Sequence, residues 1–331
     1  MGVPRSSHSI TFESFDSLAS YWLNPRYPLK WDCIFVLPPW LEVWWREFGP
    51  RTDLYLCVVK QKGTIIGFAP LLLSGEEARF IGSADVCDCL DFVLSPGSEQ
   101  DFFNILLEDL MQRGIRRLSF MPLRPDSTVL THLVGIAQER GYKVSCKAED
   151  VSLELDLPPT WEEYLGILNR KQRHEVRRKL RRLWEAGEVN YRVIEDSEAV
   201  TDAMELFLGL FRESREDKAI FMTPNMGSFF RSLAKAMTEA RLLRIGILEL
   251  DASAVAAIMC FDYNGTMYLY NSGYDRHYSS LSVGLTSKIL CIKDSIERGR
   301  KKFDFLKGSE EYKYRLGGKE IPLHKCQIVL G

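Results

Sequence analysis

The chain has 331 residues, with a formal net charge of −2. Hydrophobic residues make up 46% and charged residues 27%, which indicates a soluble globular protein with enough apolar material for two cores. The near-zero charge excludes a general attraction to nucleic acid, so any RNA contact must use a local patch. The longest apolar run, 65–73, is interrupted by Gly67 and Pro70 and falls far short of the ~20 residues of a membrane span.

No basic and apolar leader pattern is present at the N-terminus, so we expect a cytoplasmic protein. The eight cysteines are scattered, and Cys87-x-Cys89 is the only close pair. Without a second pair or a histidine at ligand spacing, a zinc site is not expected. The cysteines are therefore expected to be reduced and mostly buried, and no metal is predicted.

The first half alternates short helices and strands. Helices are predicted at 18–23, 40–48, 102–113 and 129–140. Strands are predicted at 54–59, 64–73, near 80, 117–120, 143–145 and 151–155. An acidic turn lies between the strand near Phe80 and the helix at 102–113.

The second half repeats this series, which indicates a duplicated fold. A basic helix is followed by a strand at 190–194, helices at 199–215 and 226–240, and strands at 243–250 and 255–263. Hydrophobic residues Ile321, Leu323, Ile328 and Val329 predict a terminal hairpin. Two prolines, Pro158 and Pro159, place a boundary between domains 1–157 and 158–331. The predicted fold class is α/β, with a mixed central sheet in each domain flanked by helices.

The segment from Tyr268 to Leu316 is predicted to run strand, small-residue loop, helix, strand and Tyr-Lys turn. The loop covers 276–284, the helix 285–297 and the next strand 302–306. Free amides at the start of a helix, together with the helix dipole, suit a pyrophosphate. The alternative is an ordinary crossover between two strands.

This order, ending in the pattern GxxxFDFLKGxxxYKxxxG, resembles the CelD-like branch of the GNAT acyltransferase superfamily, which is related to the Fem aminoacyltransferases. Three further stretches resemble the same branch: FVLPPWLEVWWREFG at 35–49, DCLD at 88–91, and NRKQRHEVRRKLRRLWEAG at 169–187. Together these stretches span nearly the whole chain. The resemblance implies two tandem GNAT-like domains and an acyl-CoA co-substrate, with acetyl-CoA the leading candidate.

By this resemblance the donor loop contains Ser279, Ser280, Ser282, Val283 and Gly284. GNAT enzymes usually carry Q/R-x-x-G-x-G/A here, and only the last glycine matches. The corresponding loop of the first half, 83–97, holds three aspartates and no basic residue, so it would repel a pyrophosphate. We therefore expect the second domain to bind the donor and the first to supply part of the acceptor surface.

Lys313 matches the lysine of the family's Tyr/Phe-Lys motif, which implies that it points into the active site. Such a lysine stabilises an oxyanion or orients a carboxylate. The alternative is a structural ion pair with Asp304 or Glu310. Asp304 and Tyr312 complete the predicted catalytic set. We expect the acceptor to lose its proton to an aspartate or through water, and Tyr312 or its neighbour Tyr314 to protonate the leaving thiolate.

Predicted acceptor-binding residues lie in three places. Arg173 and Arg177 belong to a helix segment, 170–182, with eight basic residues and one glutamate, where the alternative is a solvated basic face. Trp45 follows Trp40 and Trp44 on one short helix, where packing in the core is the alternative. Asp88 and Asp91 match the family's DYLD-like element, and they also suit simple capping of a loop.

Three functions are compatible with these patterns. The first is acyl transfer from acyl-CoA to an amine or hydroxyl of a small-molecule, cell-envelope or exopolysaccharide precursor. The second is an aminoacyl-tRNA-dependent Fem-like transfer, favoured by the basic helix and opposed by the acidic pI near 6.3. The third is a non-catalytic binding module in polysaccharide assembly. The sequence leaves the oligomeric state open.

Overall fold

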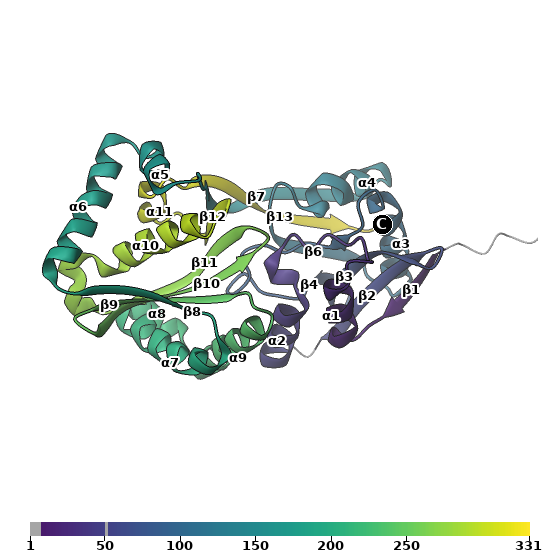
Figure 1. Ribbon diagram of the computed structural model, residues 1–331. Helices are drawn as coiled ribbons and strands as arrows, with labels where there is room; N and C mark the ends of the chain where they lie inside the picture. The colour runs from purple at the N-terminus through teal and green to yellow at the C-terminus, as the bar shows by residue number, and fades with distance from the viewer. Residues whose placement is uncertain (1–7, 50–51) are drawn as a thin grey trace, which may run out of the picture. The chain divides into compact units, whose positions relative to one another are not determined.

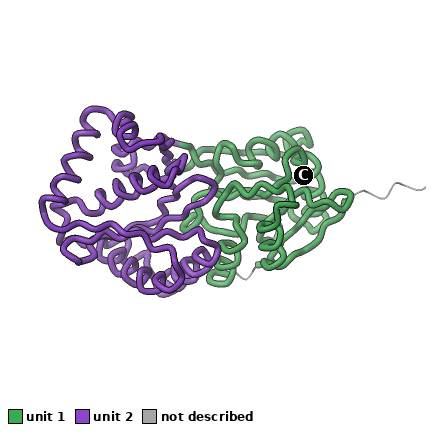
Figure 2. The backbone as a smooth tube through the Cα atoms, viewed as in Figure 1, with its two compact units in different colours: residues 1–150, 321–331 green, residues 151–320 purple. Residues whose placement is uncertain are grey.

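The computed structural model describes residues 8–49 and 52–331. The chain forms two compact units (Figure 2): unit 1 contains residues 1–150 and 321–331, and unit 2 contains 151–320. This division differs from the predicted one at 157/158. The reason is that one long strand, β7 (Lys143–Asp156), runs from unit 1 into unit 2, and the C-terminal strand returns to unit 1.

Unit 1 is a mixed sheet with helices packed on it. Its strands follow the order β1-β2-β3-β4-β6-β13-β7, with β5 paired to β3. The strands are β1 (His8–Phe12), β2 (Asp53–Gln61), β3 (Thr64–Ser74), β4 (Glu77–Phe80), β5 (Val93–Leu94), β6 (Arg117–Leu123), β13 (Lys319–Val329) and the first part of β7. The helices are α1 (Phe15–Leu23), η1 (Ile34–Val36), α2 (Pro38–Phe48), α3 (Glu99–Gln112), η2 (Val129–Leu133) and α4 (Val134–Glu139).

Two predictions about strands in unit 1 were wrong. The segments 143–145 and 151–155 are parts of the single strand β7. The expected terminal hairpin is also one strand, β13, which lies between β6 and β7. Local alternation of apolar residues predicts extended backbone but not its partner, because pairing depends on distant residues.

A disulfide joins Cys146 of β7 to Cys326 of β13, two strands that are neighbours in the sheet of unit 1. The expectation that all cysteines are reduced was therefore wrong for this pair. The two residues are 180 positions apart in the chain, and no spacing pattern in the sequence connects them. Only the arrangement of the strands brings them together.

In unit 2 the strands follow the order β7-β12-β11-β10-β9-β8, with parallel and antiparallel neighbours. The strands are β8 (Val189–Ile194), β9 (Leu243–Leu250), β10 (Ser253–Tyr263), β11 (Thr266–Tyr274), β12 (Lys302–Lys307) and the last part of β7. The helices are α5 (Trp161–Ile167), α6 (Arg170–Ala186), α7 (Ser197–Ser214), α8 (Glu216–Phe221), α9 (Pro224–Glu239), η3 (Arg276–Leu281), α10 (Val283–Glu297) and α11 (Glu311–Arg315).

Helices cover both faces of the sheet in unit 2 (Figure 1). On the face covered by α6 and α10, Ile289 and Ile292 belong to one apolar cluster with Ile258 of β10. On the other face, which α7, α8 and α9 cover, Phe230 of α9 lies 5.6 Å from the ring of Tyr270. The α/β fold class with a mixed sheet flanked by helices is thus confirmed.

Each unit contains a parallel strand pair of three residues. In unit 1, Glu77–Arg79 of β4 pairs with Arg117–Ser119 of β6, and α3 lies between them in the chain. In unit 2, Thr266–Tyr268 of β11 pairs with Lys302–Asp304 of β12, and α10 connects them. This common strand-helix-strand element is the repeat that the sequence predicted. Over residues 8–49 and 52–331, no helix combines the length and apolar composition that crossing a membrane requires.

Gly273 of β11 permits a close approach of α7 to the sheet. A Cβ atom at this position would lie 2.3 Å from the backbone nitrogen of Phe211. We expect Gly273→Ala to lower the free energy of unfolding by about 3 kcal/mol, since the backbone of α7 has to move. The matched control is Gly209→Ala in α7 itself, where nothing lies within 4 Å and alanine should stabilise the helix by about 0.5–1 kcal/mol. Urea unfolding curves of both variants measure this, and equal stabilities would contradict the assignment.

Candidate functional site

Strands β11 and β12 separate soon after they begin. They pair in parallel over only three residues each, although β11 has nine residues and β12 has six. On its other edge β11 carries a bulge, because Cys260 pairs with Leu269 while Met259 pairs with Asn271, which leaves Tyr270 extra. The later parts of β11 and β12, among the residues described, are not joined by a ladder. Part of this backbone is engaged by side chains, since the Ser272 carbonyl accepts from Lys218 and the Leu306 amide donates to Asp304.

Helix α10 begins where β11 and β12 are apart. Its N-cap residue, Ser282, has left-handed backbone angles, φ 56° and ψ 39°. The next two amides, of Val283 and Gly284, have no acceptor within the described part of the chain, as is typical of the first turn of a helix. These N–H groups and the positive end of the helix dipole favour an anion.

The remainder of the predicted donor loop is more regular than expected. Residues 276–281 form the 3₁₀ helix η3, which includes Ser279 and Ser280. The Ser282 amide donates to the Ser279 carbonyl at 2.9 Å. The prediction that the Ser282 amide is free for a ligand was therefore wrong, and the free amides begin at Val283. The loop at 276–284 is too short for its apolar and polar residues to show a helical period, so η3 was not predicted.

Gly284 serves packing as well as access. A Cβ atom on this residue would lie 2.6 Å from the ring of Tyr274, so a larger residue would push α10 away from the end of β11. The one glycine that matches the GNAT pattern is thus required by the contact between helix and strand.

A lysine from the basic helix α6 reaches the start of α10. The Lys179 ammonium group donates to Ser282 Oγ at 2.7 Å and lies 3.3 Å from a carboxylate oxygen of Glu175. Its side chain is only 14% exposed. One positive charge is therefore held next to the free amides of Val283 and Gly284. The sequence analysis selected Arg173 and Arg177 from this helix and missed Lys179.

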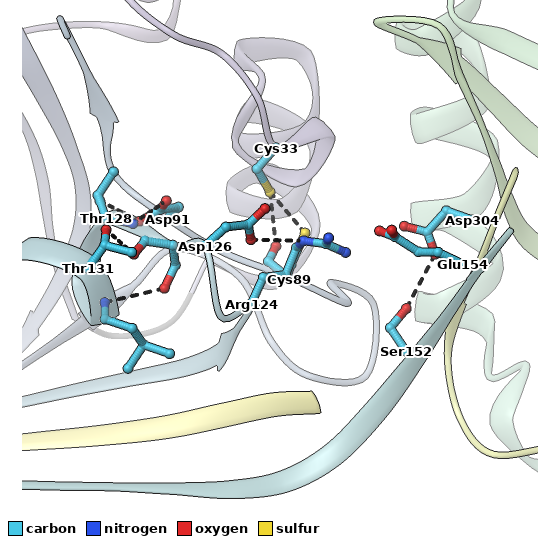
Figure 3. A network of polar contacts seen from close by, with 12 residues as sticks. Cys33, Cys89, Asp91, Arg124, Asp126, Thr128, Thr131, Ser152, Glu154 and Asp304 are labelled. Carbon is cyan, nitrogen blue, oxygen red and sulfur yellow. Dashed lines mark hydrogen bonds and ion pairs between the residues drawn. The ribbon is translucent and has the colours of Figure 1, made fainter. Parts of the chain in front are cut away.

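The end of β12 is bent at Leu306, a buried non-glycine residue with φ 60°. Asp304 Oδ1 accepts from the Leu306 amide at 2.7 Å. It also accepts from Ser152 Oγ at 3.3 Å (Figure 3). The Leu306 carbonyl accepts from the Lys313 ammonium at 2.9 Å. The two predicted catalytic residues, Asp304 and Lys313, thus hold the two backbone groups of one residue in an unfavourable conformation.

Lys313 is surrounded by protein oxygen atoms. Besides Leu306, its ammonium donates to the carbonyls of Lys307 at 2.6 Å and Gly308 at 3.0 Å, and it lies 2.9 Å from Glu310 Oε2. Because an ammonium has three N–H groups, none is left for a substrate. These contacts favour the structural ion pair that the sequence analysis gave as the alternative for Lys313.

A second lysine, Lys288 of α10, is buried at the same end of the strands, with 7% of its surface exposed. Its ammonium donates to the Gly284 carbonyl at 2.7 Å and lies 4.9 Å from the centre of the Tyr312 ring. Burial, followed by the charge of Lys218, lowers the pKa of Lys288 to about 7. Burial and then the Glu310 carboxylate raise the pKa of Tyr312, so this phenol keeps its proton at neutral pH.

Lys218 of α8 completes this cluster. Its ammonium donates to the carbonyl of Ser272 on β11 and lies 4.7 Å from the centre of the Phe211 ring. Burial, and then the charge of Arg215, lowers the pKa of Lys218 to about 8. We refer to Lys218, Lys288 and Tyr312 as the lysine cluster.

Of the lysine cluster, Tyr312 was predicted from the sequence, whereas Lys288 and Lys218 were not. One signal was present for Lys288, which occupies an inward position of a helix whose neighbours Ile289 and Ile292 are buried. A lysine within an apolar helix face is uncommon unless it has partners in the interior. For Lys218 no local signal exists, because it lies in the short helix α8, which was not predicted.

The acidic residues of the first half have a local structural role. Asp91 accepts from Thr128 N at 2.8 Å, Thr128 Oγ1 at 2.6 Å and Phe92 N at 2.9 Å, which ties its loop to the start of η2 (Figure 3). Enclosure raises the pKa of Asp91 to about 6, although the hydrogen bonds oppose this shift. Asp88 is half-buried in the same loop. Capping of the loop therefore accounts for Asp91.

The remaining predicted acceptor residues are spread over both units. Trp40 and Trp44 are buried in the core of unit 1, whereas Trp45 is half-buried. In unit 2, Arg173 donates to the Leu168 carbonyl at 3.0 Å, and Arg177 has a 60% exposed side chain. Their role in acceptor binding stays a prediction. Within the described residues, no group of three or more His, Cys, Asp or Glu side chains is arranged to hold a metal ion.

If Lys313 is structural, its replacement should affect stability. Lys313→Met leaves Glu310 and three carbonyls without their cation, and we expect a loss of about 3–5 kcal/mol in the free energy of unfolding. The control is Lys319→Met, an exposed lysine at the start of β13, with an expected change of less than about 0.5 kcal/mol. Chemical denaturation measures both. A variant of Lys313 with unchanged stability and lost activity would restore the catalytic assignment.

Comparisons with known proteins agree with this geometry. Residues 170–314 match the family described as acetyltransferase (GNAT) domain. The match begins with α6 and ends within α11, so it contains α10, Lys179 and the lysine cluster. Comparison with curated protein sequences gives no match.

Three solved structures have similar folds. FemX is 11% identical over 97% of both chains, with a TM-score of 0.66. A conserved protein of unknown function from Bacteroides thetaiotaomicron is 15% identical over 97% of this chain and 99% of that chain, with a TM-score of 0.62. The C-terminal domain of a putative lysylphosphatidylglycerol synthetase from Agrobacterium fabrum is 12% identical over 83% of each chain, with a TM-score of 0.55.

At such low identities these similarities show a common fold and nothing about substrates. The narrower assignment to the CelD-like branch stays a prediction. Residues 170–314 match the acetyltransferase (GNAT) domain family, and the chain that contains them has a fold similar to that of FemX.

Proposed function

We propose that unit 2 binds acyl-CoA where β11 and β12 separate and transfers the acyl group to an amine. The observation that carries this proposal is the three-residue pairing of β11 with β12, with the start of α10 placed between them. Where the strand pair opens, the start of α10 offers the amides of Val283 and Gly284 to the phosphates of an acyl carrier. The match of residues 170–314 to the GNAT domain supports the same donor.

The pyrophosphate of the donor would lie on the amides of Val283 and Gly284. Lys179 would add a charge-assisted contact from α6, because its ammonium is already held at Ser282 Oγ, beside these amides. This arrangement accounts for the missing family glycines, since a lysine compensates for part of the backbone contact that a glycine-rich loop would give.

The reaction would be a direct attack of the acceptor amine on the thioester carbonyl. The new C–N bond forms, the C–S bond breaks, and the amine proton and the electron pair on sulfur combine to give the amide and free CoA thiol. No covalent intermediate on the protein is required, so the protein contributes orientation and the transfer of one proton.

Tyr312 suits the role of the proton donor to the leaving thiolate. Its raised pKa keeps the phenol protonated at neutral pH, and it lies in the lysine cluster under the first turns of α10. Neither Asp304 nor Lys313 suits a proton transfer, because both are engaged in holding Leu306.

An aminoacyl-tRNA donor is the second candidate, and one surface favours it. Arg177, Arg181 and Trp184 follow one another at helical spacing on α6, and the tryptophan is 48% exposed. An exposed aromatic ring among arginines is typical of surfaces that stack on single-stranded nucleic acid. A precursor of the cell envelope or of an exopolysaccharide as acceptor remains an expectation from the sequence.

Thermal unfolding in the presence of acetyl-CoA, CoA or charged tRNA separates the donors. A ligand that binds the folded protein stabilises it by RT ln(1 + [L]/Kd), about 2.7 kcal/mol at a hundredfold excess over Kd. We expect stabilisation by acetyl-CoA and CoA, followed by release of free thiol when an amine is added. Stabilisation by charged tRNA alone would overturn the acyl-CoA proposal in favour of the second candidate, and no stabilisation by any ligand would favour a non-catalytic module.

Lys179→Met tests the donor site. We expect CoA to bind about tenfold more weakly, since one charge-assisted contact to a phosphate is lost. Arg181→Met serves as the control, because this arginine is on the same helix with a 68% exposed side chain. Isothermal titration with CoA measures both, and the difference should shrink as salt is added. Equal affinities of the two variants would place the phosphates elsewhere.

Tyr312→Phe tests the proton donor. We expect kcat to fall by about a hundredfold while the KM for acetyl-CoA changes little, because only proton transfer is removed. The control is Tyr314→Phe on the same short helix, whose hydroxyl donates to Glu320. Thiol release at saturating amine reports kcat, and full activity of the Tyr312 variant would contradict this role.

A further inference from the structure

Two buried ammonium groups approach the open end of the β11–β12 pair from opposite faces of the sheet. Lys288 comes from α10 and Lys218 from α8, and the charge of Lys218 lowers the pKa of Lys288. The contacts recorded for the two ammonium groups are neutral: a backbone carbonyl and an aromatic ring for each one. An anion that binds between the two ammonium groups would stabilise both in their charged form.

The carboxylate of Glu310 influences both lysines but does not neutralise them. It lies 2.9 Å from the Lys313 ammonium, which is its direct partner, and its side chain is 50% exposed. The other acid near Lys218, Asp217, is paired with Arg215 at 2.9 Å, so both acids beside the two lysines have cationic partners of their own. Each ammonium has three N–H groups, and the structure records one hydrogen bond for each, so donors remain for a ligand.

We propose that Lys288 and Lys218 together bind a carboxylate group of a substrate of unit 2. This inference rests on the proposed acyl transfer and adds the chemical class of one substrate. The carboxylate is carried either by the acyl group of the donor or by the acceptor amine. Its two oxygen atoms would accept from one ammonium each, in place of solvent.

The surroundings favour a carboxylate over a phosphate. Lys288 is 7% exposed, so only a narrow end group can reach it between the strands. A diphosphate is bulkier and finds its donors at the amides of Val283 and Gly284, on the first turn of α10.

Binding should depend on pH in a defined direction. The charged form of Lys288 binds the anion, so affinity should be highest below pH 7 and should fall as the pH rises through about 7 and then about 8, where Lys218 loses its proton. The other titratable groups that face these two lysines are Cys260, Cys291, Glu310, Tyr312, Arg215 and Asp217. Tyr312 and Cys260 keep their protons near neutral pH, because the pKa of each is raised. Arg215 stays charged, as arginine always does.

The first experiment reads the lysines directly in the full chain. Lysine side chains labelled with ¹³C at Cε are followed by NMR while sodium acetate is added, and acetamide is the neutral control. We expect acetate to shift the resonances of Lys288 and Lys218 at pH 6.5 and not at pH 9. Assignment uses Lys288→Met and Lys218→Met. Shifts of the same size with acetamide, or no shift with acetate, would overturn the proposal.

The second experiment identifies the source of the carboxylate. S-carboxymethyl-CoA and S-ethyl-CoA differ in a carboxylate at the acyl position, and glycine and glycinamide differ in a carboxylate on the amine. We expect one of the two pairs to show at least about tenfold tighter binding of the acid, and Lys288→Met to abolish that preference. The control is Lys293→Met on the same helix, whose side chain is 41% exposed. Preferences that persist in the Lys288 variant would overturn the proposal.

Failure of the inference and failure of the proposed function give different results. Should S-ethyl-CoA bind normally while neither acid is preferred, the acyl-CoA site stands and the carboxylate site is rejected. Should no CoA derivative bind while acetate still shifts both lysines, the anion site stands and the acyl-CoA donor is rejected.

Discussion

The bend of β12 at Leu306 is the constraint on which the rest of the site depends. A leucine with positive φ is unfavourable by about 1–3 kcal/mol and persists only where the surroundings fix it. Asp304 fixes its amide and Lys313 fixes its carbonyl. The bend ends the strand, so that α11 can follow at once and bring Tyr312 against Lys288. Without this bend the strand would continue, and the aromatic ring would lie elsewhere.

Much of the fold could be predicted because the information is local. The period of apolar residues and the glycine at the end of α10 gave the helix within two residues of its observed start, and alternation gave β11 and β12. The partners of β7 and β13 could not be predicted, because the pairing of strands depends on residues far away in the chain. For the same reason the Cys146–Cys326 disulfide was missed.

The sequence was sufficient to locate the candidate site but not to assign roles to its residues. The resemblance directed attention to the correct end of unit 2, and the start of α10 is where it was expected. It also gave catalytic roles to Asp304 and Lys313, whose contacts are those of residues that hold backbone. Residue type alone does not distinguish an ammonium saturated by carbonyls from one with free donors. The Lys288 ammonium has free N–H donors, and only its contacts in the folded chain reveal this.

The return of β13 to unit 1 has a consequence for folding of this protein during its translation. This strand is the link between β6 and β7 in its sheet, yet it is translated after every residue of unit 2. The nascent chain can therefore finish unit 2 while the sheet of unit 1 still has an open seam, with unpaired strand edges on both sides. Newly made chains should need protection of these strand edges until β13 has left the exit tunnel.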